Sequence, residues 1–231
     1  MPMSERFQQR RQVRSFVRRE GRMTDAQRQA LDDLWPRYGL ELANAPWEMS
    51  QCFGRTAPLT VEIGFGNGDH LAAAAIAHPE RNYLGVEVHR PGVGRLLLQA
   101  EQHGITNLRV ACADAVEVIR DALPPGSVDE IIIFFPDPWP KKRHHKRRLI
   151  QPEFAALLAR ALRSGGSLRL ATDWADYAQH MLTVLDAEPQ LINVAGAGGT
   201  VPRPADRALT RFETRGMKLG HRVSDFEYRR R

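Results

Sequence analysis

Four acidic residues, Glu62, Glu87, Asp114 and Asp137, each lie at or just after the end of a short apolar run. Each run is typical of a buried parallel strand, and the carboxyl ends of such strands meet at one edge of a sheet, where α/β proteins bind ligands. A single acid at such a place is most often a helix cap or a solvated side chain. Four of them predict one crevice, in which carboxylates accept hydrogen bonds from the amino and hydroxyl groups of a ligand.

A glycine-rich loop connects the first of these runs to the next predicted helix. Gly64, Gly66 and Gly68 leave bare backbone against which a ligand can lie, because glycine tolerates positive φ. A dinucleotide fingerprint would need its third glycine at position 69, which holds an aspartate. The spacing, with Glu62 before it and Glu87 at the end of the next strand, therefore favours S-adenosylmethionine, which has no phosphates. A tight turn without a ligand is the simpler alternative.

The elements that position these residues predict an α/β protein. We expect a Rossmann-like, doubly wound, mostly parallel seven-stranded sheet with helices on both faces. The predicted strands lie at residues 59–63, 82–88, 108–112, 131–135, 168–171, 209–212 and 217–219. Helices are predicted at 25–35, 69–78 and 152–163, and another ends near residue 187. The connection 36–58 is expected to be irregular, with a further turn at the glycines of 165–166.

Charge is distributed unevenly along the chain, whose net charge is +6. Lys and Arg outnumber Asp and Glu by 7 to 2 in residues 1–22 and by 6 to 0 in residues 141–148, whereas acids dominate residues 23–140 by 16 to 8. The segment 141–148 follows the fourth predicted strand, so its positive charge lies beside the expected crevice. Such a charge density favours the phosphate backbone of a nucleic acid, with a solvated loop as the alternative.

Composition excludes several other classes of protein. Cys52 and Cys112 are the only cysteines, which provides no disulfide framework and favours a reducing, cytoplasmic location. No apolar run is long enough for a membrane span, no signal-peptide core is present, and no metal site is predicted. We expect a basic, flexible arm at residues 1–24 and a single domain at 25–231, in a monomer or a homodimer.

Several motifs resemble those of the bacterial tRNA (guanine-N7-)-methyltransferases of the TrmB type. The most specific is Pro-Asp-Pro-Trp-Pro-Lys-Lys-Arg-His at 136–144. Further matches are Arg-Ser-Phe-Val-Arg-Arg at 14–19, Thr-Asp-Trp at 172–174, Thr-Arg-Phe-Glu at 210–213 and Gly-His at 220–221. The resemblance covers nearly the whole chain. It implies transfer of a methyl group from S-adenosyl-L-methionine to N7 of a guanosine in the tRNA variable loop, position 46 in the tRNA's own numbering.

The resemblance also implies roles for individual residues. Glu62, Glu87, Asp114 and Asp137 match cofactor-pocket positions, and Asp137 is also the implied catalytic residue. The positions that match substrate or RNA contacts are Lys141, Arg143, His144, His145, Lys146, Arg147, Arg148, Asp173, Thr210, Arg211, Phe212 and Glu213.

The chemistry of N7 methylation fits an acid that positions the base. Guanine N7 has a lone pair and no proton, so its methylation needs no general base. Asp137 is expected to accept hydrogen bonds from guanine N1–H and the exocyclic amine, which stabilises the positive charge that the ring acquires. Asp173 and Glu213 are equally suited to this task. Two alternatives remain open: methylation of another nucleobase atom, and a non-catalytic RNA-binding or assembly protein with this fold.

Overall fold

The computed structural model describes residues 22–205, 207, 213 and 222–231. Its centre is a seven-stranded sheet in the order β3-β2-β1-β4-β5-β7-β6, in which only β7 is antiparallel to its neighbours. This topology confirms the predicted doubly wound, mostly parallel α/β sheet. The strands are β1 (Leu59–Ile63), β2 (Asn82–Val86), β3 (Leu108–Ala111), β4 (Val128–Phe134), β5 (Leu162–Thr172), β6 (Leu191–Asn193) and β7 (Ser224–Arg230).

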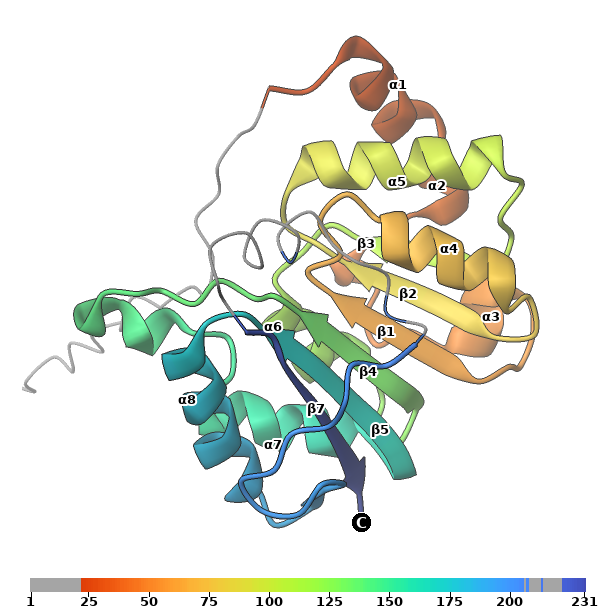
Figure 1. Ribbon diagram of the computed structural model, residues 1–231. Coiled ribbons are helices and arrows are strands. Elements are labelled where there is room, and N and C mark those ends of the chain that lie inside the picture. Colours follow the sequence, from red (N-terminus) through yellow and green to blue (C-terminus); the bar gives the residue numbers. More distant parts are fainter. Residues whose placement is uncertain (1–21, 206, 208–212, 214–221) are drawn as a thin grey trace, which may run out of the picture.

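Helices cover both faces of the sheet (Figure 1). On one face α4 and α5 cover β1 to β3 and α1 packs on α5, while α6, α7 and α8 lie on the other face. The helices are α1 (Asp25–Asp33), α2 (Trp35–Tyr38), α3 (Met49–Phe53), α4 (Asp69–Ala77), α5 (Arg90–Gln102), α6 (Ala115–Glu117), α7 (Pro152–Ala161) and α8 (Ala175–Asp186), with the 3-10 helices η1 (Leu42–Asn44) and η3 (Lys142–Arg147) and the π-helix η2 (Val118–Ala122). Within the described residues, no helix combines the length and the apolar character that a membrane span needs.

The side chains of β1 point alternately to the two faces of the sheet. Leu59, Val61 and Ile63 lie in the larger apolar cluster, together with residues of α7 and α8. Successive residues of a strand point to opposite faces, so Thr60 and Glu62 point toward the face that α4 covers. Glu62 is therefore a buried acid on the same face as the helix that follows the glycine loop.

The structure differs from the prediction mainly at the end of the sheet. The strands predicted at 209–212 and 217–219 lie outside the described residues, whereas the last two strands of the sheet are β6 and β7. In β7 the buried residues Phe226 and Tyr228 alternate with charged ones, a period of two that is typical of a strand. The connection 36–58, predicted to be irregular, contains α2, η1 and α3.

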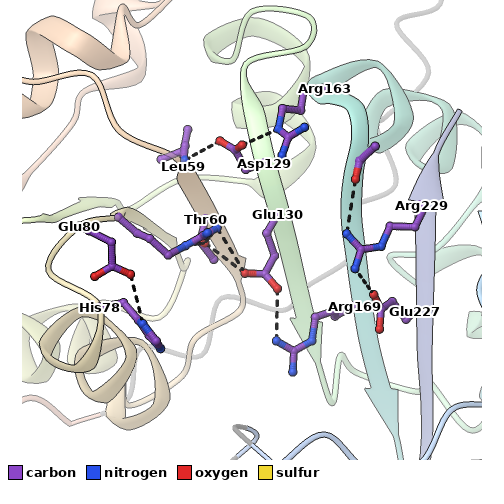
Figure 2. Close-up of polar contacts among 12 residues, drawn as sticks. Leu59, Thr60, His78, Glu80, Asp129, Glu130, Arg163, Arg169, Glu227 and Arg229 are labelled. Carbon is purple, nitrogen blue, oxygen red and sulfur yellow. Dashed lines mark hydrogen bonds and ion pairs between the residues drawn. The ribbon is translucent and has the colours of Figure 1, made fainter.

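Charged side chains toward the amino ends of the strands tie the central strands together (Figure 2). Glu130 in β4 accepts hydrogen bonds from Thr60 of β1 and from Arg169 of β5, both at 3.2 Å. Its neighbour Asp129 accepts the backbone N–H of Leu59 at 2.8 Å and the Arg163 Nε–H at 2.5 Å. The donors and acceptors of these side chains are paired across three strands. We therefore assign this edge of the sheet a structural role.

Candidate active site

The carboxyl ends of β1 to β4 lie together because these strands are neighbours in the sheet. In Figure 1 the parallel strands point toward the side on which α6 and the green segment between β4 and α7 lie. Glu62 is the penultimate residue of β1, Glu87 directly follows β2, and Asp114 and Asp137 stand shortly after β3 and β4. The structure thus places all four acids along one edge of the sheet.

The loop after β1 depends on its glycines. Gly64, Gly66 and Gly68 have φ values of 75°, 59° and 79°, in the left-handed region that other residues avoid. A Cβ at Gly68 would lie 2.8 Å from the side chain of Leu96, so this glycine allows α4 and α5 to pack closely. A Cβ at Gly66 would meet no described atom within 4 Å, so the backbone there faces open space in which a ligand can lie.

Glu87 fixes this loop from the neighbouring strand. One carboxylate oxygen accepts the Gly66 N–H at 2.9 Å, and the other accepts the N–H groups of Val88 and His89 at 2.7 and 2.9 Å. These backbone donors hold the carboxylate in one orientation beside the loop. The oxygen that accepts the Gly66 N–H has a second lone-pair direction, so the group can also accept a hydrogen bond from a hydroxyl of a ligand.

Glu62 has a partner that the sequence analysis missed. Its Oε2 lies 2.8 Å from Nδ1 of His70, which stands in the first turn of α4. Both side chains are largely buried. The His70 ring packs edge-on against Phe134 at the end of β4, with ring centroids 5.4 Å apart. The position of a histidine two residues after the last glycine of the loop was the available signal for this contact.

Asp114 and Asp137 have different surroundings. Asp114 caps α6, since its Oδ1 accepts the Val116 N–H at 2.9 Å. Asp137 is exposed and lies between Phe135 and Trp139, whose φ values are 53° and 46°. Positive φ in bulky residues stores backbone strain, and such strain gathers at functional sites. The turn that carries Asp137 is therefore held in an uncommon shape by its surroundings.

The basic segment follows this turn and contains most of the predicted RNA contacts. Lys141, Arg143 and Lys146 are exposed. The guanidinium of Arg147 lies 5.1 Å from the ring of Trp139, and the His144 ring meets Trp139 edge-on at 5.8 Å. The pKa of His144 lies below its ordinary value, because desolvation and then the neighbouring cations disfavour the charged imidazole. The segment thus presents a concentrated positive charge beside Asp137.

Arg148 differs from the other basic residues of this segment, because it is buried. Its Nε–H donates to the carbonyl of Pro138 at 2.9 Å, and its guanidinium lies 4.9 Å from the ring of Tyr177 in α8. It also pairs with Asp176, whose pKa it holds below the usual value. Tyr177 is fully buried beneath it, and burial raises the pKa of this tyrosine to about 12. Arg148 therefore fastens the turn after β4 to α8 instead of facing solvent.

Most of the remaining predicted contacts lie toward the end of the chain. Thr210, Arg211 and Phe212 are outside the described residues, and Asp173 directly follows β5 at the same edge of the sheet as Asp137. His145, half-buried, contacts Arg148 through Nε2 at 3.1 Å.

Glu213 is buried. It forms two parallel hydrogen bonds with Arg207, at 2.7 and 2.9 Å. Sequence reasoning missed Arg207, because no spacing rule links a lone arginine to the carboxylate with which it pairs.

The acids and the glycine loop fit S-adenosylmethionine. This molecule has an amino-acid group, a ribose and an adenine, all of which offer hydrogen-bond donors that carboxylates can accept. The loop offers open space above Gly66, and backbone donors already fix Glu87 beside it. Among the described residues, no group of three His, Cys, Asp or Glu side chains is arranged to hold a metal ion.

Comparison with solved structures supports the fold. The 16S rRNA methyltransferase KamB has a TM-score of 0.55 and 15% sequence identity, over 93% of this chain and 97% of that chain. The antibiotic-resistance methyltransferase Kmr has a TM-score of 0.53 and 16% identity, over 83% of this chain and 93% of that chain. At such low identity these likenesses concern the fold alone.

Comparison of sequences identifies the family. Residues 56–226 match the family Methyltransf_4, described as "Putative methyltransferase". A protein of Leifsonia xyli subsp. xyli named tRNA (guanine-N(7)-)-methyltransferase is 58% identical, over 94% of this chain and 95% of the relative. A protein of the same name from Alkalilimnicola ehrlichii is 56% identical, over 96% of this chain and 94% of the relative. The chain therefore belongs to the tRNA (guanine-N(7)-)-methyltransferase family.

Proposed function

We propose that this protein transfers the methyl group of S-adenosyl-L-methionine to N7 of guanosine 46 in the variable loop of tRNA. The observation that carries the proposal is the 56–58% identity, over nearly the whole chain, to proteins named for this reaction. The acids along one sheet edge and the basic segment beside Asp137 support it independently. The reaction would take place in the cytoplasm, where tRNA is modified.

The cofactor pocket in this proposal consists of the glycine loop and three acids. Glu87 accepts a hydrogen bond from a ribose hydroxyl, because its carboxylate is already fixed beside Gly66. Glu62 faces the positively charged amino group of the methionine part, and Asp114 lies beside the adenine. Bound S-adenosylmethionine supplies an electrophilic methyl group on a positively charged sulfur.

Asp137 positions the guanine in this proposal. Because N7 carries a lone pair, the chain needs no residue that removes a proton from it. Asp137 accepts hydrogen bonds from N1–H and the exocyclic amine, which stabilises the positive charge that develops on the ring. Asp173, which directly follows β5 at the same edge of the sheet, is a second carboxylate suited to this role. Alignment of N7 with the methyl carbon contributes much of the rate.

The basic segment holds the phosphates of the tRNA. Residues 141–148 contain six Lys or Arg residues and no acid, and their position directly after the Asp137 turn brings the backbone of the RNA to the reaction centre. Contacts of this kind set the position of the RNA without reading its sequence. We assign them to Lys141, Arg143 and Lys146, which are exposed, and to His144 and Arg147, which frame Trp139.

A chemical mapping experiment tests the proposed target. An unmodified tRNA transcript is incubated with the protein and S-adenosylmethionine, then reduced with borohydride and treated with aniline, which cleaves RNA at 7-methylguanosine. We expect one cut, at guanosine 46, and none in a transcript with adenosine at that position. A cut elsewhere would contradict the proposed position, and absence of a cut despite methyl transfer would contradict N7 as the target atom.

A further inference from the structure

A buried ionic cluster lies behind the turn that carries Asp137. Arg207 is fully buried, and its guanidinium donates to both oxygens of Glu213, at 2.7 and 2.9 Å. It also contacts both oxygens of Asp225 in β7, at 3.1 and 2.8 Å. Glu213 and Asp225 are themselves buried. One cation thus holds two carboxylates that come from different parts of the chain.

Such a cluster costs free energy to bury, so stability alone does not account for it. Desolvation of charges offsets most of their attraction inside a protein. In line with this cost, burial raises the pKa of Asp225 despite the neighbouring Arg207. Burial by itself would lower the pKa of Arg207, but its hydrogen bonds to Glu213 and the charge of Asp225 keep that pKa raised. The arginine therefore stays charged and fixed in one orientation.

The orientation of Arg207 matters because of what its guanidinium covers. It lies 5.7 Å from the ring of Phe134 and 5.5 Å from the ring of Phe135. Phe135 has a φ of 53° and stands two residues before Asp137. A bulky residue keeps such a backbone conformation only when its surroundings hold it there. Arg207 contacts the strained residue from one side, and the Phe135 N–H donates to Ala171 of β5 at 2.8 Å.

We infer that Arg207 is a positioning residue for the methyl transfer: it holds the Phe134–Phe135 turn so that Asp137 faces the target base. Glu213 supports this role by fixing the guanidinium of Arg207. This inference rests on the proposed function, because it concerns the geometry of the same reaction centre. It explains why Glu213, which sequence motifs associate with the substrate, has both of its oxygens engaged inside the protein.

A double-mutant cycle tests the inference. Arg207→Met, Glu213→Gln and the double variant are compared for kcat, for the KM of tRNA and for the Kd of S-adenosylhomocysteine measured by calorimetry. We expect each single variant to lower kcat by about tenfold to a hundredfold, with KM and Kd within about threefold of wild type. The double variant should be no slower than the slower single variant, because the two residues act as one unit. If the kcat losses of the two single variants multiply in the double variant, or if only KM changes, the inference is overturned.

Two further variants make the test independent of misfolding. Arg207→Lys keeps the charge but cannot form the bidentate hydrogen bond with Glu213. Its thermal stability should therefore stay within a few degrees of wild type, while its kcat should fall. Wild-type kcat in this variant would overturn the inference. The matched control is Arg229→Met, since Arg229 is an exposed arginine of β7 whose carboxylate partner is Glu227, at 2.6 Å, instead of Glu213. Its kcat should stay within about threefold of wild type.

The product of the wild-type enzyme is identified in the same assays. If the labelled nucleoside is not 7-methylguanosine, the proposed function fails, while the comparison of kcat between variants still reports on Arg207. If the product is 7-methylguanosine and the variants behave like wild type, the positioning role alone fails.

Discussion

Arg143 and Arg148 carry the same side chain within one basic segment, yet the structure predicts opposite consequences for their loss. Arg143→Ala removes an exposed charge, so stability should not change. Arg148→Ala removes a buried group. It leaves the Pro138 carbonyl without this donor and loses the contact with the Tyr177 ring, which together should lower the free energy of unfolding by about 2–4 kcal/mol.

In RNA binding the effects should be reversed: Arg143→Ala should change it and Arg148→Ala should not. If Arg143 neutralises one phosphate, its loss should reduce the slope of log K against log salt by about 0.7–0.9, and should weaken tRNA binding about fivefold near physiological salt. Arg148→Ala should leave that slope unchanged at a temperature where the variant is folded. The measurements are urea denaturation and tRNA binding by fluorescence anisotropy over a range of salt concentrations.

Two results would refute this reasoning. If Arg148→Ala has wild-type stability and a reduced salt slope, the buried arginine must turn outward to meet the RNA. If Arg143→Ala keeps the wild-type slope, the exposed part of the basic segment does not contact phosphates.

Three further predictions concern the site. Asp137→Asn should lower kcat by about a hundredfold or more while tRNA affinity stays within about twofold, and retained turnover would remove Asp137 from the mechanism. Gly66→Ala, which adds a methyl group in open space at positive φ, should cost about 1–2 kcal/mol of stability and weaken cofactor binding in calorimetry, whereas Gly68→Ala should cost more because it also meets Leu96. The lowered pKa of His144 should rise when phosphates bind, so a proton is taken up and tRNA affinity increases as pH falls from about 7.5 to 6; His144→Gln should flatten this dependence.

Sequence reasoning predicted the elements that depend on local patterns. The apolar runs of β1 to β4 and the glycines between β1 and α4 have short-range signatures, so the doubly wound sheet and the place of the four acids at its edge follow from them. The turn predicted at the glycines of 165–166 is wrong, because β5 begins at Leu162 and runs through these glycines as a strand. A register shift between Val128 and Glu130 of the partner strand accommodates these glycines within the sheet.

The burial of individual charges could not be predicted in this way. Arg148 belongs to the same basic run as Arg143, and only the position of α8 turns one side chain inward and leaves the other outside. Likewise, the contact between Arg207 and Asp225 joins two residues that are 18 positions apart in the sequence. Both depend on tertiary packing, which has no signature in the local sequence.

The measurement that tests the central claim most directly is identification of the methylated nucleoside. The protein is incubated with unmodified tRNA and methyl-labelled S-adenosylmethionine, the RNA is digested, and the labelled nucleoside is separated. Our account predicts label in 7-methylguanosine and its loss with Asp137→Asn. Label in another nucleoside, or no label from a protein that binds both the cofactor and tRNA, would contradict it.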